Sequence, residues 1–485
     1  MASLLSADPP PDHAAEPDDE RPDPLRSAMG GLVDLREPTA RELQKQGEAA
    51  ATGTPEAGRT AAEVALSRGP RGILQLLGPG LITGASDDDP SGIGTYSQAG
   101  SQFGTSTLWL ALFTFPLMVA VQETCARIAL QTGVGLGTAL RRKFPSWLVG
   151  VCIAAVFAAN TVNIGADLGA VAAAGGLLSG GHISPAWLVL PAALVIGFMQ
   201  LRLAYSTIFR TFKVLTLALF AYVITVVVIH PAPLQTLEAA VIPHVALDQA
   251  FLGIVVAILG TTISPYLFFW QASTEVEEMK AAGQRSERQR RGTSRRELRA
   301  ARIDVGVGML FSQLVMFSII LASGSVLHGP GRDTIETAQQ AAEALRPVAG
   351  PLAFVLFSVG VVGTGMLAVP VLSGSAAYAV KEFFGFRGSL AERPLFRPTF
   401  YGLIVLAIAG GLLMNLLQIN PIQALVATAI INGIVAAPIL VLIALLGRDR
   451  RVMGGRRSGS WSTALVWIAT ILMGAAAIGL IVTTL

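Results

Sequence analysis

The sequence predicts an all-α polytopic membrane protein, and three observations lead to this fold class. Hydrophobic residues make up 52% of the 485 residues and charged residues only 14%, with a mean hydropathy of +0.59, whereas soluble proteins carry about 25% charged residues. Apolar runs of about 18 residues or more, long enough to cross a bilayer as helices, recur along the chain. Most basic residues of the apolar region fall in short loops between these runs, so the net charge of +3 does not indicate nucleic-acid binding.

Each apolar run is expected to form one span, with ends defined to within a few residues. The eleven runs are approximately 72–103, 107–128, 146–176, 184–201, 208–230, 249–272, 303–327, 350–374, 398–418, 422–446 and 462–484. Polar residues, glycine and proline interrupt the first and the sixth run. Between the seventh and the eighth run, Thr334 to Leu345 has helical character and is expected to lie over an outer vestibule.

The basic residues are distributed unevenly between alternate loops. With the N-terminus inside, the cytosolic loops and their flanking span ends hold 24 Lys and Arg, against two on the outer side, Arg332 and Arg346. Because basic loops remain in the cytosol, we expect a plasma (inner) membrane protein with a cytosolic N-terminus and an outer C-terminus. Residues 1–70 are polar and lack a secretory signal, which predicts a disordered cytosolic tail before a membrane domain at 71–485.

Sequence patterns of catalysis are absent. The two cysteines, Cys125 and Cys152, form neither a Cys-x-x-Cys pair nor a disulfide framework. None of the five histidines falls at the centre of a predicted span, which argues against a His-based zinc or copper site. The sequence contains no Gly-rich phosphate loop, nucleophile elbow or catalytic-triad spacing. We therefore expect no enzymatic activity and no cofactor.

The first interrupted run carries three consecutive carboxylates, Asp87, Asp88 and Asp89, followed by Pro90 and Gly92. A carboxylate at the centre of a membrane helix costs about 2.5–3.5 kcal/mol, so three bystanders would cost roughly 8–10 kcal/mol. Proline removes a backbone donor, and glycine tolerates almost any dihedral angle. The pattern predicts a helix that unwinds here and presents carbonyls and a carboxylate to a cation. The alternative for Asp89 is a capping role at the second half-helix.

The sixth run has the same anatomy. Thr261 and Ser264 are followed by Pro265 and Tyr266, and the proline frees the carbonyl of Thr261 from its usual backbone donor. A single proline is commonly only a kink. Here, however, the interruptions occupy the first and sixth of the first ten spans, which are equivalent places in two halves of five. Such paired interruptions indicate the substrate site of a transporter.

These residues resemble a known family. The first helix of the Nramp metal transporters, whose signature is Asp-Pro-Gly-Asn, is similar to the runs Gly78-Pro79-Gly80 and Asp89-Pro90-Ser91-Gly92 here. Their sixth-helix signature, Met-Pro-His, is similar to Ser264-Pro265-Tyr266. The resemblance implies a leucine-transporter-type inverted repeat of five plus five helices, at about 72–230 and 249–446, with an eleventh helix at 462–484. It also implies alternating access for a divalent cation.

The resemblance carries over to the ligands residue by residue. In the family the ligands are the Asp and Asn of the first motif, the Met of the second, and a carbonyl three residues before that Met. Here the Asp is Asp89 and the carbonyl belongs to Thr261, whereas Gly92 stands in place of the Asn and Ser264 in place of the Met. The implied metal site has therefore lost an amide and a thioether.

Residues that serve proton transfer in the family also differ. Tyr266 and Gln271 stand in place of two histidines, and Ala170 replaces a Glu three residues after the retained Asp167. Because histidine is the side chain suited to proton shuttling near neutral pH, we expect transport without proton coupling. The residues expected around the ligands or along the ion path are Ser86, Asp87, Asp88, Asp167, Tyr266, Gln271 and Asn432. For Asn432 a helix–helix hydrogen bond is the alternative.

The departures from the family predict an all-oxygen, hydrated site. Oxygen ligands suit Mg²⁺, Ca²⁺ and Mn²⁺, whereas a thioether favours softer ions, and Gly92 leaves room for the waters that Mg²⁺ retains. The pattern resembles the Nramp-related magnesium transporters, which implies import of Mg²⁺ with Mn²⁺ accepted. The alternatives are a proton-coupled Mn²⁺/Fe²⁺ importer, an amino-acid or small organic-ion transporter on the same scaffold, and a metal-sensing receptor. Divalent ions and the lipid bilayer are the expected partners, and the oligomeric state, a monomer included, is left open.

Overall fold

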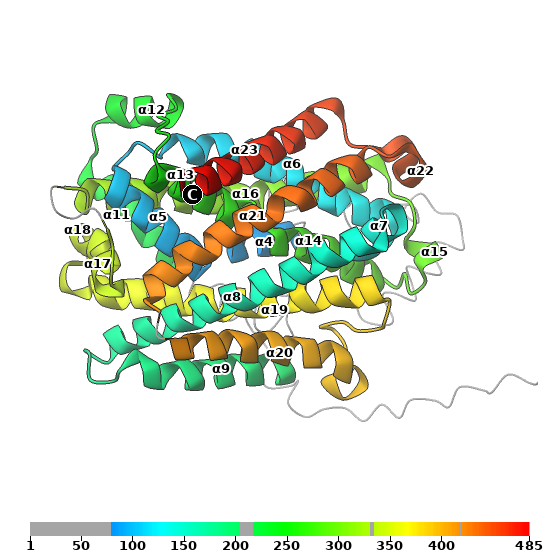
Figure 1. The fold of residues 1–485 in the computed structure, drawn as a ribbon, viewed down its shortest axis with the longest axis horizontal. Helices are drawn as coiled ribbons and strands as arrows, with labels where there is room; N and C mark the ends of the chain where they lie inside the picture. The colour runs from blue at the N-terminus through cyan, green and yellow to red at the C-terminus, as the bar shows by residue number, and fades with distance from the viewer. Residues whose placement is uncertain (1–78, 204–216, 330–333, 418, 485) are drawn as a thin grey trace, which may run out of the picture. The chain divides into compact units, whose positions relative to one another are not determined.

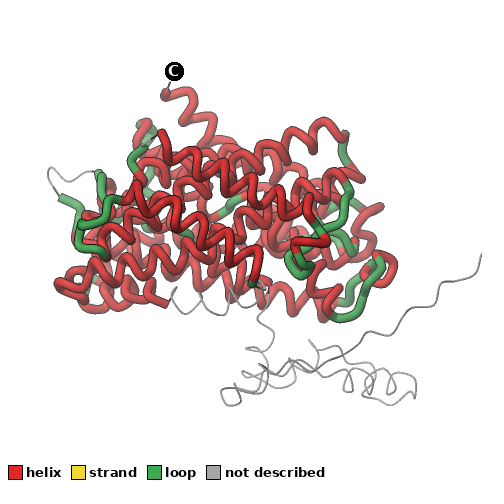
Figure 2. Tube along the Cα trace, turned by 90° about the horizontal axis from the view of Figure 1, so that it is seen from below, coloured by secondary structure: helices red, strands yellow, loops and turns green. Residues whose placement is uncertain are grey.

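The computed structural model describes residues 79–203, 217–329, 334–417 and 419–484. The described residues all belong to the unit Ala61–Leu485. Because they begin at residue 79, the predicted tail at 1–70 and the first residues of the first predicted span lie outside them. Every regular element in the described residues is a helix (Figures 1 and 2). This confirms the all-α fold class.

The helices follow the predicted runs in order. Those of the first repeat and its connections are α4 Pro79–Asp87, α5 Pro90–Phe103, α6 Trp109–Thr132, α7 Leu136–Lys143, α8 Ser146–Leu178, α9 Pro185–Arg202, η2 Leu217–Leu219, α11 Phe220–Ile229 and α12 Pro233–Val241. Those that follow are α13 Gln249–Thr262, α14 Pro265–Ala281, α15 Glu287–Arg290, α16 Arg295–Val326, α17 Ala338–Ala342, η3 Glu343–Leu345, α18 Arg346–Ala349, η4 Gly350–Leu352, α19 Ala353–Phe384, η5 Pro394–Phe396, α20 Pro398–Met414, η6 Asn415–Leu417, α21 Pro421–Gly447, α22 Arg450–Met453, η7 Gly454–Arg456 and α23 Ser460–Thr484.

Within the described residues, nine segments are long and apolar enough to cross a membrane. The two other predicted spans are the broken helix α4–α5, whose halves are short, and the fifth span, which is described only from Leu217 and continues as α11. The helical character expected for 334–345 is confirmed by α17 and η3. Both interrupted runs are discontinuous helices, as predicted.

The predicted ends of several spans were wrong, chiefly because the helices are longer than the apolar runs. Helix α14 continues to Ala281 and α19 to Phe384, and α16 begins at Arg295 rather than at 303. The hydropathy of a run marks where the chain leaves an apolar environment, but the helical hydrogen bonds continue into the polar region. For α16 the true start is set by a capping box, in which Ser294 and Glu297 bond each other's backbone N–H groups.

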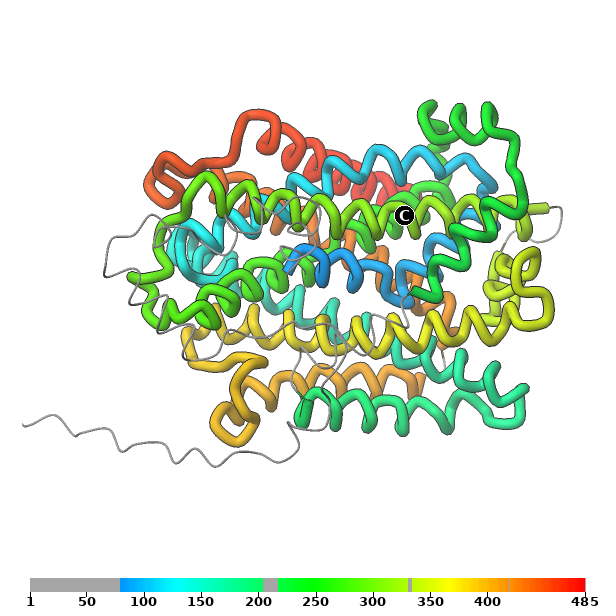
Figure 3. The backbone as a smooth tube through the Cα atoms, turned by 180° about the vertical axis from the view of Figure 1, so that it is seen from behind, coloured from blue at the N-terminus to red at the C-terminus, as the bar shows by residue number. Residues whose placement is uncertain are grey.

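The two broken helices pack against each other in opposite directions. Helix α5 lies against α13, and α4 lies against α14; Figure 3 shows the blue α4–α5 segment surrounded by the other helices. Glycines allow the neighbouring helices to approach closely: a Cβ on Gly84 would lie 2.1 Å from the carbonyl oxygen of Gly308 on α16, and one on Gly260 would lie 2.0 Å from that of Ala429 on α21. Each break is therefore held by helices outside the broken pair.

The short helix α7 joins several elements at one end of the bundle. Arg142 contacts Glu287 of α15 at 2.6 Å, and Lys143 forms an ion pair with Asp449, the N-cap of α22. The Arg142 guanidinium holds the pKa of the Glu287 carboxyl below its ordinary value, first through the hydrogen bond and then through the charge. Likewise the hydrogen bond from Lys143 is the main cause of the lowered pKa of Asp449.

Candidate metal site

The first break leaves Asp88 and Asp89 outside helical structure. Helix α4 ends at Asp87, and Asp89 adopts an extended conformation (φ −70°, ψ 170°) immediately before Pro90 opens α5. One oxygen of Asp89, Oδ1, accepts hydrogen bonds from the Gly92 N–H at 2.7 Å and from the Ser91 hydroxyl at 2.6 Å. Asp89 is thus the N-cap of the second half-helix. Its other oxygen points to a different helix.

The second break has the same local design, with proline in the first turn of the second half-helix. Helix α13 ends at Thr262 and α14 begins at Pro265, with Ser264 extended at the N-cap position. The Ser264 hydroxyl does not cap α14. It donates to the carbonyls of Gly260 at 2.5 Å and Thr261 at 3.0 Å. The carbonyl of Thr261 that proline frees is therefore occupied by Ser264 in this conformation.

Contacts between the two breaks bring the predicted ligands together. A Cβ on Gly92 would lie 3.3 Å from the Thr261 hydroxyl oxygen and 3.3 Å from the carbonyl oxygen of Asp87. The Tyr266 hydroxyl donates to the carbonyl of Ser86 at 3.0 Å. The space that we expected Gly92 to leave for water is thus lined closely by neighbouring atoms, because α5 and α13 pack directly on each other in this conformation.

Helix α8 contributes a residue that the sequence analysis missed. Asn163 donates from Nδ2 to Asp89 Oδ2 at 3.1 Å and to Asp167 Oδ2 at 3.3 Å, and its Oδ1 accepts from Asn432 of α21 at 3.3 Å. Asp167 is thereby connected to Asp89 through one amide, and Asn432 makes the helix–helix hydrogen bond that was its alternative role. Asn163 and Asp167 are four residues apart on one face of α8, and this spacing was the available signal.

The remaining carboxylates of the first break face α16. The Ser312 hydroxyl lies 2.5 Å from Asp87 Oδ2 and 3.2 Å from Asp88 Oδ1. The second oxygens, Asp87 Oδ1 and Asp88 Oδ2, are buried and have no hydrogen-bond partner among the described residues. Ser312 was also missed from sequence, because a serine in an apolar helix is common and carries no distinctive pattern.

Gln271 occupies a different place from the other predicted residues. It lies more than one helical turn beyond the break, where its Oε1 accepts from Thr83 of α4 at 2.6 Å and its Nε2 donates to Glu275 at 3.0 Å. These contacts join the two half-helices α4 and α14. No described contact brings Gln271 to Asp89.

The site is buried and rich in carboxyl groups. Asp87, Asp88, Asp89 and Asp167 are each at most 1% exposed, and none of them takes part in an ion pair with another described residue. The described residues contain no group of three or more His, Cys, Asp or Glu side chains placed to hold a metal together. A cation at the breaks would therefore rely on one or two carboxylates with neutral oxygen donors, the ligand types that suit hard cations.

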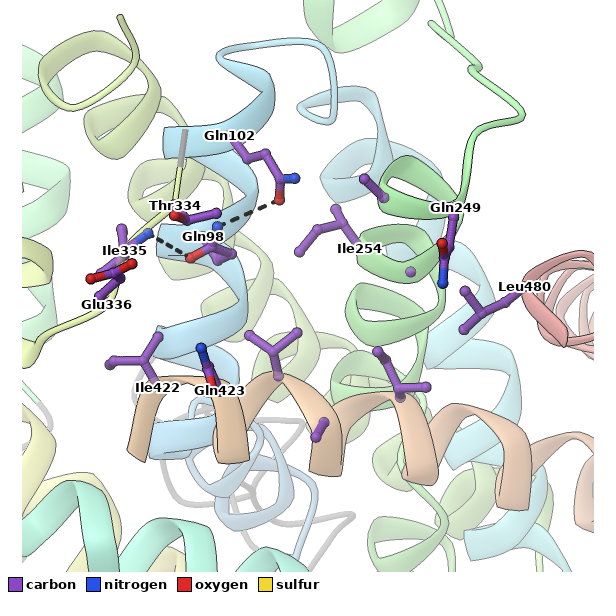
Figure 4. Close-up of a pocket in the computed structure, with 15 residues that line it drawn as sticks. Gln98, Gln102, Gln249, Ile254, Thr334, Ile335, Glu336, Ile422, Gln423 and Leu480 are labelled. Atoms are coloured by element: carbon purple, nitrogen blue, oxygen red, sulfur yellow. Dashed lines mark hydrogen bonds between the residues drawn. The ribbon is translucent and has the colours of Figure 1, made fainter. Parts of the chain in front are cut away.

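A cavity of about 500 Å³ opens at one end of the same bundle (Figure 4). Four glutamine side chains line it, Gln98, Gln102, Gln249 and Gln423, together with Thr334–Glu336 and apolar residues of α13, α21 and α23. The segment expected over a vestibule does border a cavity. Neither Asp89 nor Ser264 lines it.

Comparisons with known proteins agree with this architecture. The family model described as Nramp, natural resistance-associated macrophage protein-like, matches residues 80–483. The divalent metal cation transporter MntH of Bacillus subtilis is 24% identical over 428 residues, which cover 86% of this chain and 94% of the relative. MntH of Deinococcus radiodurans is 25% identical over 426 residues, covering 86% and 92%.

Solved structures share the fold. A manganese transporter of Eremococcus coleocola superposes with a TM-score of 0.64 at 17% identity, over 84% of this chain and 86% of the other. Mhp1, a nucleobase-cation-symport-1 family transporter, superposes with a TM-score of 0.51 at 15% identity, over 84% and 90%. With its two discontinuous helices and a family model that matches nearly all of the described residues, the chain belongs to the Nramp family.

Proposed function

We propose that this protein is a secondary transporter that imports divalent metal cations by alternating access, favouring Mg²⁺ and accepting Mn²⁺. The observation that carries the proposal is the meeting of two broken helices at Asp89, which is buried and lacks a cationic partner among the described residues. Membership of a family whose named relatives transport divalent metals supports the substrate class.

The preference for hard ions rests on the second break. The residue before Pro265 is Ser264, which is fully buried and offers a hydroxyl oxygen where the family has a thioether. Together with Asp89 and the Thr261 carbonyl, it makes an all-oxygen set. Oxygen donors favour Mg²⁺ and Mn²⁺ over softer ions such as Cd²⁺. For a partly hydrated ion to fit beside Gly92, α5 and α13 must separate during the cycle, since both pack closely there.

Transport without proton coupling is supported by the side chains around the breaks. Tyr266 and Gln271 hydrogen-bond to Ser86 and Thr83 respectively, where histidines would offer groups that titrate near neutral pH. The membrane potential alone provides about 2.3 kcal/mol per charge per 100 mV, hence roughly 4.6 kcal/mol for a divalent ion. In the orientation expected from the basic loops, the cavity in Figure 4 is the outer vestibule of this pathway.

Flux into vesicles tests the proposal. The purified protein is reconstituted in proteoliposomes with an internal Mg²⁺- or Mn²⁺-sensitive dye and a set membrane potential. We expect Mg²⁺ uptake to rise with an inside-negative potential. External Mn²⁺ should inhibit this Mg²⁺ uptake more strongly than Cd²⁺ at equal concentration. A strong preference for Cd²⁺ would contradict the all-oxygen argument. Acidification of the lumen that depends on the metal would instead identify a proton-coupled Mn²⁺/Fe²⁺ importer.

A further inference from the structure

The amide of Asn163 lies where a cation bound to Asp89 would meet it. Asn163 is fully buried, and its Nδ2 is 3.1 Å from Asp89 Oδ2 and 3.3 Å from Asp167 Oδ2. In the conformation described here it donates hydrogen to both carboxylates. An N–H donor next to a divalent cation is unfavourable, because both carry positive charge. A cation bound at Asp89 would therefore favour the amide oxygen of Asn163, rather than its Nδ2, beside the carboxylate.

The neighbouring amide of Asn432 is placed to accommodate such a change. Its Nδ2 donates to Asn163 Oδ1 at 3.3 Å, and its own Oδ1 is buried without a partner among the described residues. A half-turn about the terminal torsion of an asparagine exchanges its oxygen for its nitrogen at almost the same positions. If both amides turn, Asn163 Nδ2 donates to the unpartnered Asn432 Oδ1, and the bond between the two residues is kept with its direction reversed.

We infer that Asn163 is a ligand of the transported cation, which supplies its amide oxygen by this rotation, with Asn432 turning alongside it. The inference rests on the proposed function, since it concerns the ion bound at Asp89. The oxygen from α8 replaces the amide that the family carries in the first motif and that Gly92 lacks here. The hydrogen bonds to the two carboxylates are then exchanged for contacts of those carboxylates with the cation.

The test compares two substitutions at the same position. Asn163→Leu removes donor and acceptor, and Asn163→Asp keeps an oxygen ligand but removes the donor. The matched control is Asn160→Leu. Asn160 is an equally buried asparagine on α8 that donates to the carbonyl of Leu372 at 3.0 Å, and no hydrogen bond joins it to the aspartates among the described residues. Binding of Mg²⁺ and Mn²⁺ to the purified full-length protein is measured by calorimetry, and folding by thermal melting.

We expect Asn163→Leu to weaken binding of both ions at least tenfold, since mutation of even an outer-shell partner of a metal ligand typically costs 10–100-fold in affinity or activity. Asn163→Asp should bind at least as tightly as the wild type, and Asn160→Leu should stay within about twofold of it. A purely structural role predicts instead that Asn163→Leu lowers thermal stability while the folded variant binds both ions within about twofold of the wild type. Asn163→Asp as weak as Asn163→Leu would overturn the inference.

If either variant fails to fold, a crystal structure can show directly whether Asn163 Oδ1 binds the cation. In a crystal structure of the wild-type protein with Mn²⁺, located by its anomalous signal, we expect Asn163 Oδ1 among the metal ligands. Mn²⁺ at Asp89 with Asn163 Nδ2 still donating to a carboxylate would refute the rotation. Wild-type protein that binds neither ion would refute the proposed function itself, and this outcome is distinct from a wild type that binds with Asn163 uninvolved.

Discussion

Asp89 holds two roles that one substitution can separate. As N-cap of α5 it accepts from the Gly92 N–H, and as the carboxylate between the two breaks it faces Asn163. Asparagine caps helices about as well as aspartate, whereas alanine costs about 1 kcal/mol. Asp89→Asn therefore keeps the cap and the shape of the side chain while removing the charge, and Asp89→Ala removes both.

The size of the expected effect follows from the charge. At 4 Å and an effective dielectric constant of about 20, one unit charge pair is worth about 4 kcal/mol, so a carboxylate gains about 8 kcal/mol from a divalent ion. Desolvation of the ion and of the carboxylate costs several kcal/mol and offsets most of this attraction, which leaves about 2 kcal/mol. That corresponds to a rise of about 30-fold in the half-saturating ion concentration. Thermal stability without the ion should not fall in Asp89→Asn, since asparagine keeps the cap and a buried charge is itself unfavourable.

Uptake by proteoliposomes over a range of Mg²⁺ and Mn²⁺ concentrations measures this effect. The control is Asp248→Asn, because Asp248 caps α13 in the same way, accepting from the Phe251 N–H at 2.9 Å, but is exposed and far along the helix from the break. We expect Asp248→Asn to transport like the wild type. Half-saturation of Asp89→Asn within a factor of three of the wild type would refute the reasoning, as would equal losses in the two variants.

Three further outcomes follow from other contacts. Ser264→Met introduces a soft ligand and should raise inhibition by Cd²⁺ relative to Mg²⁺ in a competition assay. An unchanged ratio of Cd²⁺ to Mg²⁺ inhibition would show that residue 264 does not set ion selectivity. Gly260→Ala places a methyl group 2.0 Å from a backbone oxygen of α21 and should lower stability by about 1–3 kcal/mol in melting experiments, while Gly253→Ala on the same helix, where the nearest atom is 3.8 Å away, should not. The pKa of Glu287 is lowered by Arg142, so their bond stabilises the fold above the ordinary value of 4.5 and is lost as the pH falls through the lowered pKa. Because both side chains are well exposed, Glu287→Gln should cost less than about 1 kcal/mol at pH 7, and the difference from the wild type should vanish in acid.

The discontinuous helices could be predicted from sequence because the signal is local. A carboxylate followed by proline and glycine within an apolar run cannot form a regular membrane helix at low cost. The positions of Pro90 and Pro265 therefore locate both breaks to within one or two residues. The pairing of the two breaks required only that they occupy equivalent places in two halves of the chain.

The surroundings of Asp89 could not be derived in the same way. Asn163 and Ser312 reach the first break from α8 and α16, which are 74 and more than 200 residues away along the chain. Such contacts depend on how the helices are rotated about their axes, and an isolated amide or hydroxyl in an apolar run has no periodicity that reports this. The contacts of Gln271 could not be predicted either. The family motif suggested a place near the metal site, whereas its side chain bonds to Thr83 and Glu275.

The burial of four carboxyl groups at the breaks bears on how the proposed carrier would return after releasing its ion. Asp87, Asp88, Asp89 and Asp167 are buried together against hydroxyl and amide donors. In the proposed cycle, a carrier that returns without a cation takes these carboxyl groups through the membrane without an ion to compensate those that are ionised. We therefore expect the loaded form to cross more readily than the empty one. Exchange of one cation for another across the membrane should then be faster than net uptake when both compartments contain the ion.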